Sequence, residues 1–263
     1  MKTITADKIK KIIAQLCVKA NLELRSDVLV MLKKARNTES SKRAKKLLGA
    51  IIDNANVARA EQLAICQDTG MPVVFLEVGQ DVRISGSLQQ AVNKGVELGY
   101  KKAWARGKST YSPVVVHVDI VPGSKLKMTV LPKGFGCENK SLLKMFSPTA
   151  KIEEIKGFII DAVKAAGPDA CPPYVLGVGI GGTADFASLL AKKALLRKIG
   201  TRSSKIEADL LKAINKLDIG PMGLGGKTTA LAVNIETYPT HIAGLPVALN
   251  FSCHALRSAT ATL

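Results

Sequence analysis

The stretch A-I-C-Q-D-T-G-M-P-V-V-F at 64–75 places a thiol, an amide, a carboxylate and a hydroxyl on one short turn between two apolar segments. A simple connector normally uses Asn, Gly, Ser or Pro at such a place. Asp-Thr-Gly at 68–70 would serve as an ordinary turn, so this stretch alone decides little. Its residue types nevertheless suit metal or substrate binding, which directs attention to the other cysteines.

Two further cysteines lie in unusual company. Cys171 precedes Pro-Pro-Tyr and a glycine-rich segment, and Cys253 ends an apolar run in L-N-F-S-C-H-A-L-R. A single cysteine is most simply a small buried apolar residue. Cys66, Cys171 and Cys253, however, each lie at the end of an expected element, where ligands and catalytic groups tend to be found. Three thiolates suit an iron–sulfur cluster, and a [4Fe–4S] cluster with three cysteine ligands leaves one iron able to act as a Lewis acid.

The composition is that of a globular protein with a strong basic excess. The chain has 263 residues, 47% of them apolar and 22% charged, and no apolar run approaches the length of a membrane helix. The N-terminus lacks the features of a signal peptide, and five widely spaced cysteines do not suggest a disulfide framework, so we expect a cytoplasmic protein. The net charge of +17 is spread along the chain and aromatic residues make up 4%, which makes nucleic-acid binding a distant alternative.

Hydrophobic periodicity predicts helices first and then mixed strands and helices. Helices are expected at 5–20, 25–35, 39–64, 87–105, 139–146, 151–166, 183–196 and 203–217, and strands at 73–78, 83–84, 114–121, 125–131, 174–180, 228–236 and 245–252. The pattern favours an α+β fold in which a helical N-terminal lobe packs on a mixed strand and helix core carrying an iron–sulfur site. We expect a single domain over 1–263, with the lobe at 1–64 and the cluster-binding core at 65–263.

Two glycine-rich segments resemble nucleotide-binding motifs but lack essential parts. Gly177–Gly182 fits G-x-G-x-x-G between a strand and a helix, yet no acidic residue ends a second strand about 20 residues later. These glycines more simply let a backbone pass close to a ligand or metal centre. Pro221–Thr228 resembles a phosphate loop, but it begins with Pro and precedes a strand, although its backbone N–H groups could bind a carboxylate. His117, in the middle of a strand, is expected to be a half-buried structural residue.

The sequence resembles the α subunit, or N-terminal domain, of class I fumarate hydratases and the related L-tartrate dehydratases. The matching stretches are I-C-Q-D-T-G-M-P-V at 65–73, L-P-K-G-F-G-C-E-N-K-S at 131–141, A-C-P-P-Y-V-L-G-V-G-I-G-G-T at 170–183, G-P-M-G-L-G-G-K-T-T-A-L at 220–231 and T-H-I-A-G-L-P-V-A-L-N-F-S-C at 240–253. The first and third stretches are highly specific in combination. The resemblance extends over nearly all of the chain after residue 40.

The resemblance implies an oxygen-sensitive [4Fe–4S] cluster held by Cys66, Cys171 and Cys253, whose open iron binds a carboxylate and the hydroxyl of malate. It places Gln67, Asp68, Gly134 and Gly136 at the substrate, with Asp68 helping to orient the catalytic base. His241, twelve residues before the last cysteine, corresponds to the active-site histidine of the family. The turn at 66–70 would therefore bring a cluster ligand and substrate-facing groups to one point.

Two departures from the family pattern affect the expected substrate pocket. Cys137 stands where the family usually has Ser, so we do not expect it to be a cluster ligand. The segment at 101–113 is shorter than in the family, and Arg106 is the nearest candidate for the arginine found there.

The resemblance also implies a partner chain and leaves alternatives of function open. A separate β subunit would supply further substrate-binding groups and the base, which predicts a hetero-oligomer acting on a small dicarboxylate. The sequence of 132–141 favours the hydration of fumarate to (S)-malate. The alternatives are an L-tartrate dehydratase α subunit and a non-catalytic paralog with a trimmed substrate loop.

Overall fold

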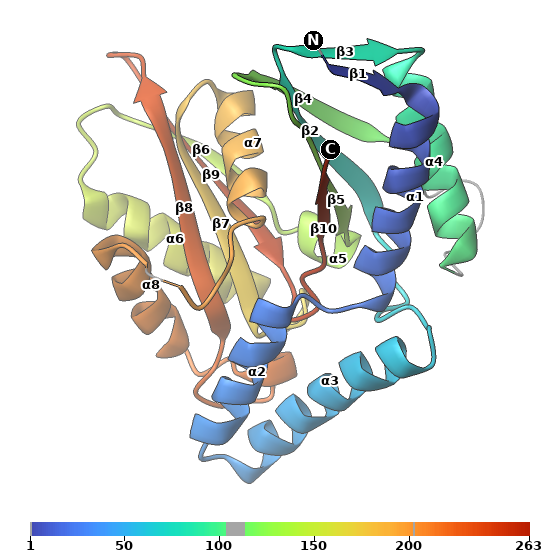
Figure 1. The fold of residues 1–263 in the computed structure, drawn as a ribbon. Coiled ribbons are helices and arrows are strands. Elements are labelled where there is room, and N and C mark those ends of the chain that lie inside the picture. The colour runs from blue at the N-terminus through green and yellow to red at the C-terminus, as the bar shows by residue number, and fades with distance from the viewer. Residues whose placement is uncertain (1, 104–113, 202) are drawn as a thin grey trace. The chain divides into compact units, whose positions relative to one another are not determined.

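The computed structural model describes residues 2–103, 114–201 and 203–263 (Figure 1). The chain divides into two compact units. Unit 1 comprises Met1–Arg25, Asn54–Phe135 and Arg257–Leu263, and unit 2 comprises Ser26–Asp53 and Gly136–Leu256. Each unit combines helices with a sheet that has both parallel and antiparallel pairs, so the fold is a mixed α and β fold. The assignment of a single domain stays a prediction.

Unit 1 is built on a four-stranded sheet in the order β10-β5-β2-β4. Its elements are β1 (Lys2–Thr5), α1 (Ala6–Leu22), β2 (Met71–Gly79), β3 (Val82–Ser85), α4 (Leu88–Lys102), β4 (Val115–Val121), β5 (Leu126–Lys133) and β10 (Ala259–Thr262). The strand β2 pairs antiparallel with β5 and parallel with β4, while β1 and β3 form a separate parallel pair.

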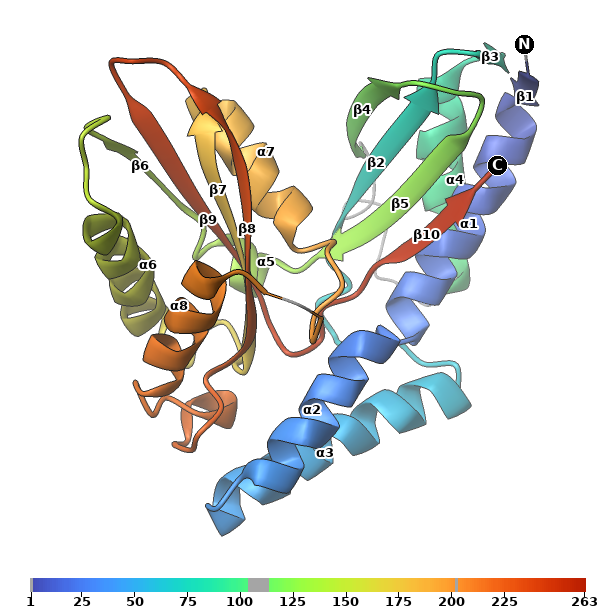
Figure 2. The ribbon, with the colours of Figure 1, turned by 60° about the vertical axis from the view of Figure 1, so that its left-hand side comes forward.

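The helices α1 and α4 cover one face of the unit 1 sheet (Figure 2). Helical spacing brings Ile9, Ile13 and Cys17 to one side of α1, where they are completely buried against residues of the sheet. The helices approach closely because Gly95 and Gly99 of α4 face α1, where a Cβ on Gly99 would lie 2.6 Å from the carbonyl oxygen of Ala14. This packing supplies the core on which the turn at 66–70 rests.

Unit 2 is built on a second four-stranded sheet in the order β6-β9-β7-β8. Its elements are α2 (Ser26–Thr38), β6 (Leu142–Phe146), α6 (Ile152–Ala166), β7 (Tyr174–Gly182), α7 (Ala184–Ala194), α8 (Lys205–Asn215), the short 3-10 helix η2 (Pro221–Gly223), β8 (Ala230–Thr240) and β9 (Leu245–Ser252). The helix α3 (Lys42–Ala60) has residues in both units, as does the short helix α5 (Phe135–Glu138).

The two faces of the unit 2 sheet carry different helices. Leu176 and Val178 of β7 point into a core shared with α6 and α8, while Gly177 and Gly179 face α7. A Cβ on Gly177 would lie 2.0 Å from the carbonyl oxygen of Ala191, and one on Gly179 would lie 2.0 Å from that of Ala187. The glycines of the G-x-G-x-x-G pattern therefore let a helix lie directly on the strand. The expectation that they admit a ligand or metal centre was wrong for these two, because α7 occupies that space.

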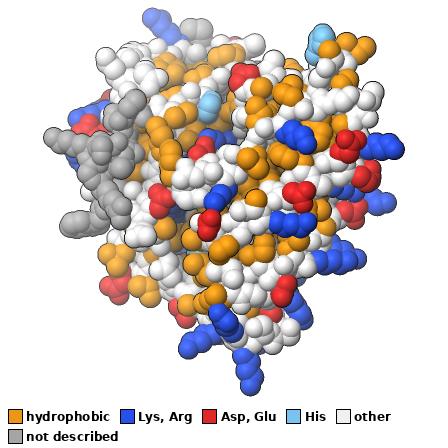
Figure 3. All heavy atoms as spheres, turned by 180° about the vertical axis from the view of Figure 1, so that it is seen from behind, with side chains coloured by type: hydrophobic (Ala, Val, Ile, Leu, Met, Phe, Trp, Pro, Cys, Tyr) orange, Lys and Arg blue, Asp and Glu red, His pale blue; other side chains and the backbone are white. Residues whose placement is uncertain are grey.

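Basic side chains are dispersed over the surface. Figure 3 shows Lys and Arg spread over one face, with Asp, Glu and apolar side chains between them. Some of these cations are paired locally, as Lys94 and Lys101 are with Glu97 on α4 at 2.9 and 2.7 Å. Pairs of this kind, three or four residues apart, are typical of solvated helix surfaces.

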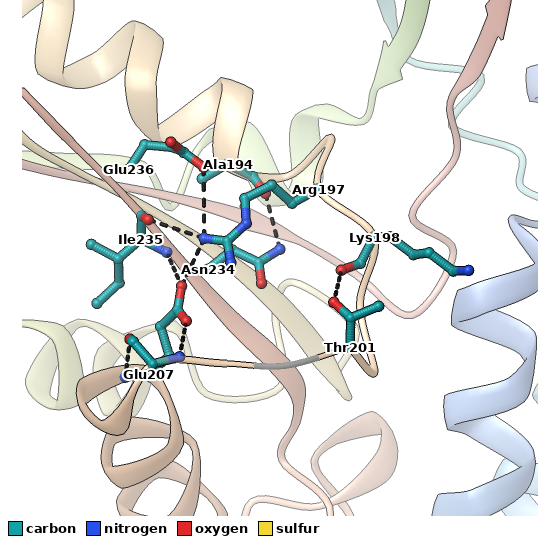
Figure 4. Close-up of polar contacts among 9 residues, drawn as sticks. Ala194, Arg197, Lys198, Thr201, Glu207, Asn234, Ile235 and Glu236 are labelled. Carbon is teal, nitrogen blue, oxygen red and sulfur yellow. Dashed lines mark hydrogen bonds and ion pairs between the residues drawn. The ribbon is translucent and has the colours of Figure 1, made fainter.

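A buried carboxylate joins α8 to the edge strand β8 in unit 2 (Figure 4). Glu207, which is 3% exposed, accepts hydrogen bonds from the backbone N–H groups of Ser204 and Ile235 at 2.7 and 2.8 Å. Arg197 Nη1 lies 2.7 Å from Glu207 Oε1 and donates to the Ile235 carbonyl at 3.0 Å. Burial raises the pKa of Glu207, but the hydrogen bonds from Ser204, Ile235 and Arg197 outweigh it and leave the pKa below its ordinary value.

Most of the expected elements are present, with one clear error. The segment expected to be a helix at 139–146 instead contains the strand β6, which pairs antiparallel with β9 at the edge of the unit 2 sheet. The segment lacks the alternation of apolar and polar residues that marks a strand, because its apolar residues Leu142, Leu143 and Met145 are all exposed. Pairing with a neighbouring strand overrides the local helix propensity. The strands β1 and β10 were not expected. His117 is half-buried on β4 and stacks on Phe75 at a ring distance of 5.2 Å, which confirms its structural interpretation.

Among the described residues, no helix combines the length and the apolar character that crossing a bilayer requires.

Candidate active site

The turn at Cys66–Gly70 in unit 1 is held by the carboxylate of Asp68. Asp68 Oδ1 accepts a hydrogen bond from the Gly70 N–H at 3.0 Å, and Oδ2 accepts one from the Phe135 N–H at 2.8 Å. Gly70 adopts a φ of 73°, and a Cβ there would lie 2.7 Å from the carbonyl carbon of Pro132. The Asp and the Gly are therefore required by the turn itself, because one closes it and the other admits the neighbouring strand.

This arrangement brings two of the expected substrate residues together. A Cβ on Gly134 would lie 3.0 Å from Asp68 Oδ2, so the absence of a side chain at 134 leaves room for the carboxylate. Cys66 and Asp68 are partly exposed and Gln67 is exposed. Gly136 begins the part of α5 that belongs to unit 2, and a Cβ there would meet no described atom within 4 Å. Arg106 lies outside the described residues.

Two buried side chains form hydrogen bonds with backbone carbonyl groups of the same turn. The Tyr100 hydroxyl is 3.3 Å from the Thr69 carbonyl oxygen and 3.2 Å from that of Gly70. Burial raises the pKa of Tyr100, which keeps its hydroxyl neutral and able to donate. Arg257 Nη2 donates to the Asp68 carbonyl at 2.7 Å. Arg257 was not among the expected site residues, although a cation in the otherwise uncharged segment A-L-R-S-A-T was a signal of an unusual position.

Cys171 and Cys253 lie next to each other in unit 2. The strands β7 and β9 are antiparallel with Val175 opposite Ser252, so the start of β7 and the end of β9 meet at one end of the sheet. His254 closes this end, since its N–H lies 3.4 Å and its Nδ1 3.0 Å from the Cys171 carbonyl oxygen. Cys171 has a φ of 53°, a conformation that is unfavourable for a residue with a side chain and is often kept at functional sites.

The five cysteines differ in exposure. Cys66, Cys171 and Cys253 are partly exposed, whereas Cys17 and Cys137 are buried. Cys137 lies close to the start of β7, where its Sγ donates to the Ala170 carbonyl at 3.4 Å. Among the described residues, no group of three or more His, Cys, Asp or Glu is arranged to hold a metal ion. Within unit 2, Cys171 and Cys253 form a pair, and Cys66 belongs to unit 1.

His241 is not near this pair of cysteines. It lies exposed in the turn between β8 and β9, where Ile242 is 87% exposed. The strand β9 runs for eight residues from Leu245 to Ser252, which at about 3.3 Å per residue separates His241 from Cys253 by roughly 26 Å. Both residues belong to unit 2, so this separation holds whatever the position of unit 1.

Two N–H groups of the second glycine-rich loop are occupied by carboxylates of the protein itself. The Gly226 N–H donates to Asp218 Oδ1 at 2.9 Å, and the Lys227 N–H donates to Glu39 Oε2 at 2.8 Å. Glu39 is 6% exposed, and its other oxygen accepts from the N–H groups of Ser40 and Ser41 at 2.8 and 3.0 Å. The loop does bind carboxylates through its backbone, but these belong to the fold rather than to a ligand.

A comparison with protein families matches residues 10–262 to the family described as fumarate hydratase (Fumerase). Among curated proteins, "Putative L(+)-tartrate dehydratase subunit alpha" of Methanocaldococcus jannaschii is 39% identical, and the match covers 96% of each chain. The L(+)-tartrate dehydratase subunit alpha of Escherichia coli strain K12 is 30% identical, with 97% of this chain and 90% of the relative covered. The protein of the same name in Shigella sonnei gives the same values.

The chain therefore belongs to the fumarate hydratase family. The predicted family is confirmed, and with it the prediction of a hydro-lyase, the enzyme class that the family and its relatives share.

Proposed function

We propose that this chain is the α subunit of a [4Fe–4S]-dependent hydro-lyase that reversibly hydrates fumarate to (S)-malate. The observation that carries the proposal is the meeting of Cys171 and Cys253 at one end of the unit 2 sheet. The family supplies the reaction class, and the two thiols are the reason to place the chemistry at this end of β7 and β9.

The donor set fits an iron–sulfur cluster. Three thiols at element ends, all partly exposed, are accessible to iron, whereas burial raises the pKa of the Cys17 thiol and keeps it protonated. We assign the ligand roles to Cys66, Cys171 and Cys253. When bound, the cluster would supply a Lewis-acidic iron that polarises the hydroxyl leaving or entering the substrate.

The residues of the turn at 66–70 would bind and orient the substrate. The two oxygens of Asp68 are held by the N–H groups of Gly70 and Phe135, so its carboxylate keeps one orientation and can act on a neighbouring base without moving. The exposed amide of Gln67 is available to a substrate carboxylate or hydroxyl. Gly134 and Gly136 would let the substrate approach the backbone next to Asp68, and Arg106 stays a proposed cation for the same ligand.

His241 lies too far from Cys171 and Cys253 of its own unit 2 to act on a substrate bound there. The length of β9 separates His241 from Cys253 by roughly 26 Å, and the turn that holds His241 is exposed. We therefore propose that His241 contributes to the site of another copy of the chain in a hetero-oligomer.

A separate β subunit and a dicarboxylate substrate complete the proposal. The relatives are named as alpha subunits of L(+)-tartrate dehydratase, which supports both a partner chain and L-tartrate as the second candidate substrate. Malate and L-tartrate are both dicarboxylates with a hydroxyl group at carbon 2, and each loses water in its reaction. A cluster of this kind and thiols kept reduced suit the cytoplasm, which stays our predicted location.

Iron and acid-labile sulfide per chain, measured after anaerobic reconstitution, test the cluster directly. The wild type should take up four irons, as should Cys137→Ser, while Cys171→Ser should lose the cluster because one of its three ligands is gone. Cys137→Ser is the matched control, since it removes a neighbouring buried thiol by the same exchange.

Loaded protein, co-expressed with the partner chain, should then consume fumarate faster than L-tartrate. A faster reaction with L-tartrate would favour the second candidate. A folded wild type that takes up no iron would contradict the cluster and leave the non-catalytic paralog as the better description.

A further inference from the structure

Arg257 is a buried cation with most of its hydrogen-bonding groups unused. The residue is 4% exposed, and Nη2 donates to the Asp68 carbonyl at 2.7 Å. Its Nε and Nη1 atoms are buried and have no hydrogen-bond partner among the residues that the structure describes. Arg257 also forms no ion pair with any of the described residues. A guanidinium stays charged in proteins, so this arrangement buries a positive charge that has two N–H-bearing atoms without an acceptor among the described residues.

The turn itself does not need a charge at this position. Asp68 already closes it through the Gly70 N–H, and the neutral hydroxyl of Tyr100 reaches the carbonyls of Thr69 and Gly70. A neutral donor could also satisfy the Asp68 carbonyl, and without the desolvation of a cation. The choice of arginine therefore points to an interaction other than the one with the backbone.

The positive charge of Arg257 acts at the turn that carries Cys66. Burial raises the pKa of Tyr100, and the charge of Arg257 lowers it. The charge of Arg257 is therefore felt at the Tyr100 hydroxyl, which contacts the carbonyls of Thr69 and Gly70. The two N–H-bearing atoms without partners belong to the same guanidinium. Buried arginines of this kind are normally satisfied by an anion that accepts their hydrogen bonds.

We propose that Arg257 is a positioning residue for the Cys66–Gly70 turn and donates Nε–H or Nη1–H hydrogen bonds to an anionic acceptor bound at that turn. The proposal rests on the proposed function, which offers two acceptors of this chemistry. One is an anionic sulfur of the cluster, either an inorganic sulfide or a cysteine thiolate, and the other is a carboxylate of the substrate. Hydrogen bonds to sulfur raise the reduction potential of a cluster, whereas hydrogen bonds to a carboxylate raise the affinity for the substrate.

The test compares Arg257→Gln and Arg257→Lys with the wild type and with Arg83→Gln. Arg83 is an exposed arginine of β3 in the same unit, so its variant controls for the loss of a charge. Reconstituted proteins are examined for iron per chain, for the reduction potential of the cluster, and for the affinity for succinate, an unreactive four-carbon dicarboxylate. Circular dichroism checks that each variant is folded.

A lower reduction potential in Arg257→Gln, with Arg83→Gln unchanged, identifies cluster sulfur as the acceptor. An unchanged potential with a succinate affinity at least tenfold weaker identifies the carboxylate. If Arg257→Gln does not fold, Arg257→Lys decides, since it keeps the charge and loses the planar group. Wild-type potential and wild-type succinate affinity in the folded variants would overturn the proposal.

The anion site at Arg257 can be tested even if the protein binds no cluster. If the wild type takes up no cluster, succinate is titrated against the melting temperature of the apoprotein. A rise in the wild type that is absent in Arg257→Gln would uphold the anion site without the cluster. No rise in either protein would overturn this inference together with the cluster.

Discussion

Replacing Gly179 of β7 with Ala should push the helix α7 away from the unit 2 sheet and lower the stability of the protein. A Cβ at this position would lie 2.0 Å from the Ala187 carbonyl oxygen and 2.6 Å from the Ala191 nitrogen, and both are backbone atoms of α7. Real Cβ atoms essentially never approach another heavy atom within 3.0 Å. The helix must therefore withdraw from β7 by about 1 Å, because a backbone cannot rotate away as a flexible side chain can.

The withdrawal affects the small apolar cluster between α7 and the sheet. Ala187, Ala191 and Ala248 are at most 2% exposed and touch across this interface. A gap of 0.5–1 Å removes roughly a quarter to a half of the dispersion energy of such contacts. Overpacking of a core by one methyl group typically destabilises by about 1–3 kcal/mol. Since the strained atoms are backbone, we expect about 2–3 kcal/mol for Gly179→Ala, at the upper end of that range.

Urea unfolding followed by far-ultraviolet circular dichroism measures the effect as a lower midpoint. Gly157→Ala is the matched control, because Gly157 lies within α6 and a Cβ there meets no described atom within 4 Å. The control should be more stable than the wild type by roughly 0.5–1 kcal/mol, since alanine favours a helix. A midpoint for Gly179→Ala at or above that of the wild type would refute the assignment of these glycines to helix packing.

Two further substitutions test other contacts of unit 2. The pKa of Glu207 is lowered in the fold, so its charged form contributes stability above its unfolded pKa of about 4.3, and this contribution is lost as the pH falls through the folded pKa. Glu207→Gln should therefore lower the urea midpoint at pH 7, and its difference from the wild type should shrink as the pH is lowered below about 4; a difference independent of pH would contradict this account. Glu39→Ala should destabilise by roughly 1–3 kcal/mol and speed tryptic cleavage after Lys227, whose N–H loses its carboxylate partner. Cleavage at the wild-type rate would show that Glu39 does not hold the loop.

The order of elements was largely predictable because the core residues follow simple periods. The apolar run at β2 predicted a strand, and the helical spacing of Ile9 and Ile13 predicted the helix α1. β6 was not predictable in the same way, because its exposed leucines have no alternation, and only pairing with β9 makes it a strand. β10 is a four-residue strand whose partner β5 lies more than 120 residues earlier in the chain.

The candidate site was predictable in its residue types but not in its distances. The sequence singled out Cys171 and Cys253, and the antiparallel register of β7 and β9 places them together. It also grouped His241 with them, because a separation of twelve positions between His241 and Cys253 looks short in the sequence, yet most of the residues between them form an extended strand. Arg257 was overlooked, since its importance comes from burial and from its contact with Asp68, and neither is visible in a local pattern.

Unit 1 is completed by residues that are synthesised after the whole of unit 2. Until Ala259–Thr262 leave the ribosome, β5 keeps an open edge, and the Asp68 carbonyl has no Arg257. Native folding of the cysteine-bearing turn must therefore await synthesis of Arg257–Leu263, whereas unit 2 has all its strands earlier. Leu263 exchanges backbone hydrogen bonds with Leu126 at 3.1 and 2.9 Å, so the main chain is still part of the unit 1 sheet at this residue.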